Sequence, residues 1–285
     1  MKSRTLGWID IPENRSGKFA IVHKTLKKGE RVTMRSRRES LFGGGKGAFT
    51  VLPYNVRIHY LLEEGSNRWA SDHPQEVHSQ LPLVKDFYGD VLVGGLGVGL
   101  ILTPLKQNPK VKYVTVVEKS PDVIRLVWDS VSDHYSNVVE ADLFDYLREC
   151  KRKGKTFDNG YFNIWCPNGE DVLFTHIRPL RELSKGVVKD KLTCWQEDVM
   201  TGQLRFELVT SLATLGQMPG YVGLSEERFD AAYKHSRTRW PFWAWYRAER
   251  PGVKKAQKMA ELYAKDYAFS TPAWQKTFGK HDRRK

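Results

Sequence analysis

The sequence predicts an α/β fold with a mostly parallel sheet, because short apolar runs alternate with helix-like segments from about residue 86 to residue 210. The strand candidates are apolar, which is typical of strands covered by helices on both faces. A glycine-rich turn follows the first run, and a glutamate ends the second. We expect a small β-hairpin domain before this sheet and a basic helical tail after it.

Apolar runs and helix-start signals define the elements of this region. Ser120 and Pro121 are typical of a helix N-cap and first helical residue. A tail helix at 254–268 follows from apolar residues at helical spacing, and 279–285 is expected to be disordered. We expect strands at 90–93, 111–117, 137–140, 161–165 and 186–195, and helices at 100–107, 121–132, 143–151 and 171–183.

The first 70 residues predict short strands joined as hairpins. Strands at 19–22 and 31–34 flank one turn, and strands at 48–52 and 56–60 flank another. The glycine-rich segment 42–47 lacks the hydroxyl residue that follows the lysine of a phosphate-binding loop, so we expect a turn there. The predicted domains are a β-rich domain at 1–80, a sheet domain at 81–225 and a basic, aromatic extension at 226–285.

Positive charge is concentrated at the two ends of the chain. Residues 1–50 hold 12 Lys/Arg against 4 Asp/Glu, and residues 226–285 hold 15 against 7. Basic ends predict a polyanion partner such as nucleic acid, whereas the alternative is a solvated surface. The segment 237–247 places five aromatics among three arginines. Its rings either stack on unpaired bases or pack against a core.

The remaining bulk features predict a cytoplasmic protein without a membrane span. No apolar run approaches the ~20 residues that cross a bilayer, and no secretory signal begins the sequence. The three cysteines form no metal knuckle. His73 and His78 lack a third ligand, so we expect no metal site. Cys166 is expected to be a buried small side chain rather than a nucleophile.

The glycine turn has the residues of an adenosyl-ligand site. Gly94, Gly95, Gly97 and Gly99 allow a tight turn and close approach of backbone to ligand. Their spacing suits S-adenosylmethionine better than a dinucleotide, because the third glycine of a dinucleotide fingerprint falls at Leu100. Glu118, at a strand tip, can accept hydrogen bonds from ribose hydroxyls.

Asp142 follows the third strand and has two possible uses. Its carboxylate can accept from the exocyclic amine of adenine, with Leu143 completing the adenine slot. It can equally cap the following helix. We favour adenine contact, because three ligand-type positions recur in the correct order along the chain.

Three segments together resemble the class I S-adenosylmethionine-dependent methyltransferases, and more narrowly their spermidine-synthase-like branch. The segments are 91–99, 116–124 and 140–147, and 69–72 and 81–83 add to the likeness. The sequence is also similar to methyltransferase-like proteins of phages and metagenomes. The resemblance implies a Rossmann-like domain in which the four glycines line the methionine and ribose. It also implies that Glu118 binds ribose, that Asp142 and Leu143 hold adenine, and that Asp72 lies near the methionine or acceptor.

Two departures from that branch bear on the reaction. Gly97 stands where polyamine synthases carry an aspartate in the glycine turn, and Asn163 stands where they carry a catalytic aspartate. An amide is neither a general base nor an electrostatic partner for an ammonium ion. We therefore expect methyl transfer, with aminopropyl transfer as a disfavoured alternative.

The segment after the fourth strand has two interpretations. Asn163 and Trp165 are the residue types with which amino-methyltransferases of nucleic acid bind a target amine and stack on its base. Alternatively, Asn163 closes a turn and Trp165 lies in the core. We expect an S-adenosylmethionine-dependent methyltransferase acting on nucleic acid, a nucleic-acid-associated protein or another acceptor. The further alternative is a non-catalytic nucleic-acid-binding module on the same fold.

Overall fold

The computed structural model describes residues 4–5, 9–34, 49–64, 67–166, 171–217 and 240–282. The chain folds into two compact units. The first comprises residues 1–166 and 180–196, and the second comprises residues 167–179 and 197–285. The chain returns from the second unit to the first within α6 (Arg178–Ser184).

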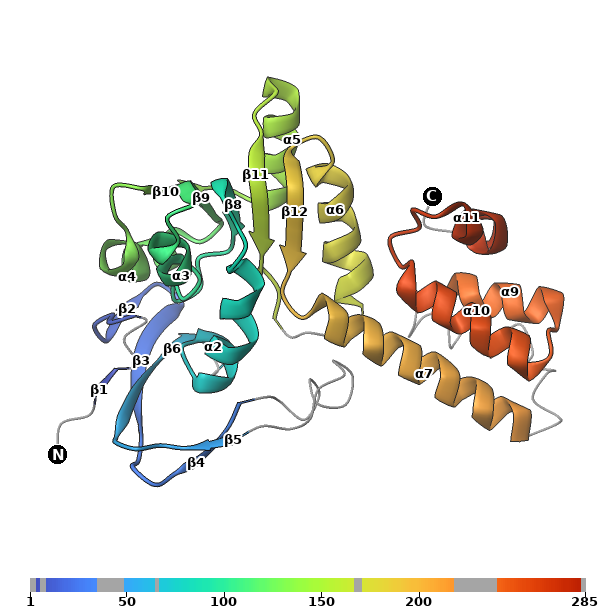
Figure 1. The fold of residues 1–285 in the computed structure, drawn as a ribbon, viewed down its shortest axis with the longest axis horizontal. Helices are drawn as coiled ribbons and strands as arrows, with labels where there is room; N and C mark the ends of the chain where they lie inside the picture. The colour runs from blue at the N-terminus through green and yellow to red at the C-terminus, as the bar shows by residue number, and fades with distance from the viewer. Residues whose placement is uncertain are drawn as a thin grey trace. The chain divides into compact units, whose positions relative to one another are not determined.

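The first unit contains a five-stranded parallel sheet with the strand order β10-β9-β8-β11-β12 (Figure 1). The chain runs outward from β8 to β10 and then returns to the other side of β8. This change of direction makes the carboxyl ends of β8 and β11 the topological switch point, where ligands bind in such sheets. The strands are β8 Gly89–Gly94, β9 Val111–Glu118, β10 Ser136–Glu140, β11 Phe157–Phe162 and β12 Val188–Cys194.

Helices connect these strands and confirm the predicted α/β class. Right-handed crossovers place α3 (Leu102–Gln107) and α4 (Pro121–Val131) on one face of the sheet and α5 (Leu143–Lys153) on the other. The Ser120 hydroxyl accepts from the Val123 N–H at 3.4 Å, as an N-cap does. Buried side chains from β8, β9 and α4 form one apolar core: Val91, Val93, Val114, Val116, Val123 and Val127.

Two predicted elements of this sheet domain differ from the structure. The fourth strand runs over β11 and not over 161–165, because its polar residues are accommodated inside the sheet. The Asn159 amide donates to the Tyr88 carbonyl at 2.7 Å, and Gly160 leaves room for Leu192 and Val188. The predicted helix at 171–183 is a π-helical turn, η2 (Leu173–Ile177), followed by α6.

The N-terminal strands form one long antiparallel ribbon and not two local hairpins. β3 (Phe19–Leu26) pairs with β6 (Val56–Glu63), and β4 (Arg31–Thr33) pairs with β5 (Phe49–Val51). In every pair the two residue numbers add to the same total, so the register continues from one half of the ribbon to the other. The predicted pairing of 19–22 with 31–34 is therefore wrong.

The physical reason lies at the expected first turn. The Gly29 N–H donates to the Leu52 carbonyl at 2.9 Å, and the Leu52 N–H donates to the Glu30 carbonyl at 3.0 Å. The chain at 27–30 thus bends but keeps its partner on the returning strand. The glycine-rich segment 42–47 lies outside the described residues.

Three further strands and one helix complete the N-terminal region. β1 (Arg4–Thr5) and β7 (Asn67–Ser71) both pair with β6, and β2 (Asn14–Ser16) pairs with β3. Helix α2 (Pro74–Gln80) leads into a 3₁₀ turn, η1 (Leu81–Val84), before β8.

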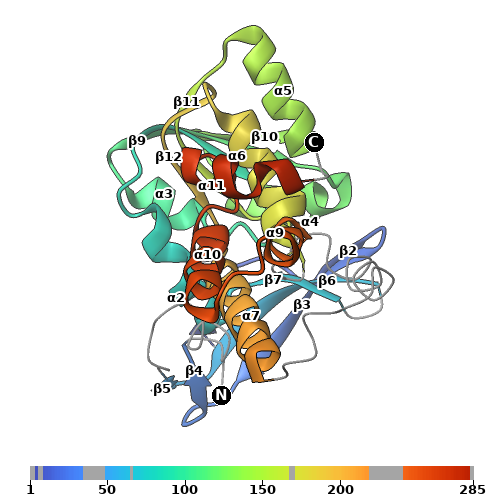
Figure 2. The same ribbon diagram turned by 90° about the vertical axis from the view of Figure 1, so that its right-hand side faces the viewer.

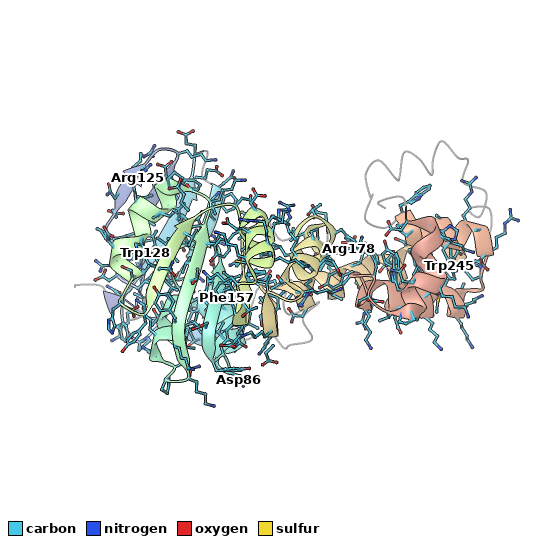
Figure 3. All side chains as sticks on the ribbon, turned by 90° about the horizontal axis from the view of Figure 1, so that it is seen from above. Asp86, Arg125, Trp128, Phe157, Arg178 and Trp245 are labelled. Carbon is cyan, nitrogen blue, oxygen red and sulfur yellow. The ribbon has the colours of Figure 1, made fainter. Side chains whose placement is uncertain are left out.

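A polar clamp fastens this N-terminal sheet to α4. The Ser16 hydroxyl donates to Asp122 at 2.8 Å, and Arg125 contacts both Ser16 and Asp122. Gly17, at φ +50°, lies so close to the Asp122 carboxylate that a Cβ there would collide with it. Figure 1 shows α4 beside β2 and β3, and Figure 3 shows Arg125 on this side of the unit.

The second unit is helical and has an aromatic core. Figure 2 shows its helices α7, α9, α10 and α11 next to one another. Phe242, Tyr263, Trp274 and Phe278 are fully buried, and the rings of Tyr263 and Phe278 meet edge to face at 5.2 Å. The helices are α7 Glu197–Gln217, α9 Trp240–Glu249, α10 Val253–Lys265 and α11 Pro272–Phe278, with a 3₁₀ turn η4 Gly279–His281.

Two expectations for the tail are settled by this core. Trp240, Phe242 and Trp245 are buried, so packing accounts for these rings of the aromatic segment (Figure 3 labels Trp245). The expected disorder is wrong for Gly279–His281, which forms a turn, and for the buried Asp282. None of the helices in the described residues is both long enough and apolar enough to cross a bilayer.

Candidate functional site

The parallel register brings the predicted ligand residues to one edge of the sheet. Gly94 pairs with Val117 on one side and with Phe162 on the other. Glu118 pairs in turn with Glu140 on β10. The residues that follow these strand ends, among them Gly95, Asp142 and Asn163, therefore lie at the same carboxyl edge.

The glycine turn is glycine for identifiable steric reasons. Gly95, Gly97 and Gly99 have φ values of +90°, +54° and +69°, which disfavour any side chain. A Cβ on Gly95 would lie 2.3 Å from the Asn163 carbonyl oxygen, and one on Gly94 would lie 2.4 Å from the Leu143 side chain. The turn thus approaches the chain after β11 and the start of α5 at once.

The two other glycines have neighbours as well. A Cβ on Gly97 would lie 3.1 Å from Ala70 of β7, so the N-terminal sheet reaches this part of the turn. A Cβ on Gly99 would lie 2.8 Å from Val131 at the end of α4. Packing alone therefore explains the glycine at position 99.

Glu118 is attached to the glycine turn. One carboxylate oxygen accepts from the Leu96 N–H at 2.9 Å, and the other accepts from the Ser120 N–H at 2.8 Å. A carboxylate offers about four lone-pair sites, so two remain for hydroxyl donors. The half-buried Glu118 side chain is positioned to serve as an acceptor at the end of β9.

Asp142 is the N-cap of α5. Its Oδ1 accepts from the Phe144 N–H at 2.9 Å, and its Oδ2 meets the Lys119 ammonium at 3.0 Å. Burial raises the pKa of this carboxyl, but the hydrogen bonds from Lys119 and Phe144 outweigh it and leave the pKa below its ordinary value. The capping interpretation is confirmed, and adenine contact by Asp142 and the buried Leu143 stays a prediction.

Asn163 is held at the switch point by its backbone and its side chain. Its N–H donates to the Gly94 carbonyl at 2.9 Å. Burial raises the pKa of the neighbouring Tyr161 hydroxyl far above its ordinary value, while a hydrogen bond from the Asn163 side chain lowers it in part. The Tyr161 hydroxyl in turn donates to Gln80 of α2 at 3.0 Å.

The residues after Asn163 differ in exposure. Trp165 is only 4% exposed, which favours the core interpretation, and its substrate role stays a prediction. Cys166 is exposed, so the expectation of a buried thiol is wrong. Its Sγ donates to the Arg68 carbonyl at 3.4 Å. Although the residue as a whole is exposed, desolvation of the sulfur beside the Arg68 carbonyl raises the pKa of this thiol, which disfavours a nucleophilic role.

Asp72 occupies a fully buried pair that the sequence did not reveal. Its Oδ1 accepts from the His59 N–H at 2.6 Å, and its Oδ2 lies 2.9 Å from His59 Nδ1. His59 is also fully buried and stacks edge to face on His23 at 4.7 Å. His59 falls on the face of its strand that the alternation of apolar and polar residues predicts to be exposed. The pattern therefore did not indicate that His59 is buried. A position for Asp72 near the methionine or acceptor stays a prediction.

A second acid of the N-terminal region was also missed. Glu76 of α2 accepts from the Ser71 N–H at 3.1 Å and from the Ser71 hydroxyl at 2.6 Å. Burial is the largest cause of its raised pKa. Ser71 lies five residues before Glu76 and the N-cap of α2 is His73, so the pair does not have the spacing of a capping box and no local signal identifies it.

No metal cluster accompanies these groups. Within the described ranges, no three His, Cys, Asp or Glu side chains are arranged to hold an ion. His73 caps α2 instead, because its Nδ1 accepts from the Gln75 N–H at 3.2 Å.

Comparisons with known proteins can now be set beside this geometry. No family model matches the sequence. Over 118 residues the chain is 31% identical to polyamine aminopropyltransferase 1 of Streptomyces coelicolor, and the match covers 37% of this chain and 22% of that protein. The chain therefore matches about a fifth of the length of its curated relative.

Solved structures give weaker likenesses. An S-adenosylmethionine-dependent methyltransferase of Agrobacterium tumefaciens has a TM-score of 0.36 at 16% identity, over 52% of this chain and 55% of that one. A spermidine synthase in complex with a transition-state analogue has a TM-score of 0.34 at 16% identity, over 57% and 62%. Human methyltransferase-like protein 13, in complex with SAH, scores 0.29 at 21% identity, over 39% and 54%.

The strand order, the crossovers and the glycine turn of the chain define its fold. The chain has a Rossmann-like α/β fold with a five-stranded parallel sheet. This fold confirms the Rossmann-like sheet and the preceding β region predicted from the sequence. Substrate and reaction do not follow from fold alone.

Proposed function

We propose that the chain binds S-adenosylmethionine at the carboxyl edge of its parallel sheet and transfers a methyl group to a nitrogen acceptor. One observation carries the proposal: the glycine turn is contacted by Glu118, Leu143 and Asn163 together. These residues lie at or just after the ends of β9, β10 and β11. The glycine turn itself follows the end of β8, so four strand ends contribute to the site. Such convergence at the switch point is the expected form of an adenosyl-ligand site.

The residues present fit this cofactor. Glu118 keeps acceptor capacity for ribose hydroxyls after meeting the Leu96 and Ser120 N–H groups. The turn from Gly95 to Gly99 has no side chain at three positions, so its backbone can approach a ligand. When bound, S-adenosylmethionine supplies an electrophilic methyl group. The chain's part is then to orient the acceptor and exclude water.

Two positions favour methyl transfer over aminopropyl transfer. Neither 94–101 nor 163–166 contains a carboxylate. An aminopropyl donor lacks the methionine carboxylate and presents a cation, which an acidic side chain would bind. Gly97 and Asn163 provide none. The similarity to a polyamine aminopropyltransferase makes aminopropyl transfer the second candidate.

The acceptor is proposed from Asn163. Its carboxamide can accept a hydrogen bond from an N–H group and cannot take up a proton. This chemistry suits an exocyclic or side-chain amine better than an unactivated alcohol. A nucleic-acid base or a nucleic-acid-associated protein would supply such a nitrogen. A binding module without catalysis on the same fold is the remaining alternative.

Calorimetric titration of the full chain with S-adenosylmethionine and with its decarboxylated form tests the proposal. We expect binding of S-adenosylmethionine at least tenfold tighter than binding of the decarboxylated form. A reversed preference would establish aminopropyl transfer instead. Absence of binding by either compound would remove both enzymatic functions.

Glu118→Ala should weaken S-adenosylmethionine binding at least tenfold, or by about 1.4 kcal/mol, because the ribose hydroxyls lose their acceptor. Glu140→Ala is a matched control, since Glu140 is exposed and pairs with Glu118 across the strands. Its affinity should match the wild-type value. Equal affinities for all three proteins would show that the ribose lies elsewhere.

A further inference from the structure

The described tail, residues 240–282, separates its charges by sign. All eight basic residues are exposed, whereas two of the four acidic residues are buried. The buried acids are Asp266 and Asp282. The basic residues are Arg247, Arg250, Lys254, Lys255, Lys258, Lys265, Lys276 and Lys280.

The buried acids interact with groups of the protein itself, through hydrogen bonds or an ion pair. Asp266 accepts from the Ser270 N–H at 3.1 Å and from the Thr271 N–H at 2.9 Å, and it also binds both hydroxyls. Asp282 lies 3.7 Å from Arg178. Glu249 and Glu261 are the acids left exposed in residues 240–282, and Lys280 already contacts Glu249 at 3.4 Å. The surface of this segment is therefore strongly positive.

Helix α10 concentrates part of this charge in one stripe. Lys254, Lys258 and Lys265 lie within about 40° of one another around the helix axis and span about 16 Å along it. The exposed Glu261 lies on the same face between Lys258 and Lys265, so the stripe is positive by the excess of three lysines over one glutamate. The opposite face is buried through Ala256, Ala260 and Tyr263. A duplex presents one phosphate charge per about 1.7 Å of its axis. The lysine stripe (Lys254, Lys258 and Lys265) thus spans about ten phosphate charges.

The aromatic rings of this segment are unsuited to stacking on bases. Val253 is the large apolar side chain exposed in 240–282, and the rings there are buried or, at Trp243 and Tyr246, half-buried. Single-strand binding relies on exposed rings as stacking platforms. A surface of ammonium groups without exposed rings instead suits backbone contact that is independent of base sequence.

We propose that the lysine stripe of α10 binds the phosphate backbone of double-stranded nucleic acid. The ligand is recognised by its density of phosphate charge and not by its base edges. Matched DNA and RNA duplexes share this chemistry and separate the two sources. The inference does not rest on methyl transfer, and Glu118→Ala should bind a duplex as the wild type does.

The test is a salt titration of duplex binding by the full chain, measured as fluorescence anisotropy. We expect K254E/K258E/K265E to weaken binding at least tenfold at low salt. The slope of log K against log salt should fall by about 0.9 for each lost phosphate contact. The matched control is K151E/R152E/K153E, which makes the same charge change on exposed positions of α5. It should keep most of the affinity and the slope.

Three results would overturn the proposal. Equal losses in the two triple variants would show a diffuse charge effect. Tighter binding of a single strand than of the duplex would show base stacking. Binding of anionic vesicles without binding of duplex would show a lipid-surface function. Circular dichroism and thermal melting of each variant ensure that a loss of binding is not a loss of folding.

Discussion

The carboxyl edge of the parallel sheet and the helical second unit differ in which side chains they bury and which they leave available for a ligand. At the sheet edge, glycines and acids converge and keep hydrogen-bonding capacity. In the second unit, the aromatic rings turn inward and lysines remain outside. Parallel strands force their carboxyl ends together, whereas amphipathic helices bury whichever side chains are largest and most apolar.

Two carboxylates make the difference concrete. Asp266 is 5% exposed and accepts from two backbone N–H groups and two hydroxyls of Ser270 and Thr271. Glu118 accepts from two N–H groups and is half-buried. Asp266 therefore has no acceptor capacity left, while Glu118 does. The number of hydrogen bonds that a carboxylate already accepts within the protein distinguishes a structural acid from one that can still bind a ligand.

The largest expected effect is on the aromatic core. Trp274→Ala should destabilise the second unit by about 4 kcal/mol, because the fully buried ring packs against Phe269 and Phe278. Urea unfolding measures the loss. Trp243→Ala, at a half-buried ring, should cost less. If Trp274→Ala also weakens S-adenosylmethionine binding more than twofold while the chain stays folded, the two regions are energetically coupled and the contrast between them fails.

Next in size is the effect of a methyl group in the glycine turn. Gly95→Ala should cost about 3 kcal/mol, because it combines φ +90° with a 2.3 Å approach to the Asn163 carbonyl. Gly186→Ala is the matched control, since Gly186 has φ +80° and open space around it. It should cost about 1 kcal/mol. Equal costs by urea unfolding would mean that close packing at the switch point contributes nothing.

The smallest expected effect is at Asp142. Its pKa is lowered below the ordinary 3.8, so its charged form stabilises the fold above that pH. Asp142→Ala should cost about 1 kcal/mol at pH 7 through loss of the cap. Asp142→Asn keeps a capping oxygen and should show a smaller deficit that shrinks as pH falls below 3.8. A deficit in thermal melting that stays constant from pH 7 to pH 3 would contradict the ion pair with Lys119.

The sequence by itself determined the parallel sheet, the glycine turn and the acid at the end of β9. Each follows from local information, since apolar runs, turn glycines and helix caps act over a few residues. The convergence of Gly95, Glu118 and Asn163 was also predictable, because a parallel alternation leaves one edge for all carboxyl ends.

Only the tertiary structure decided which distant segments meet. The pairing of β3 with β6, the buried pair of His59 and Asp72, and the burial of Trp245 all depend on contacts between residues far apart in the sequence. Strand pairing and burial are chosen by the free energy of the whole packed unit, so local patterns leave several partners equally acceptable.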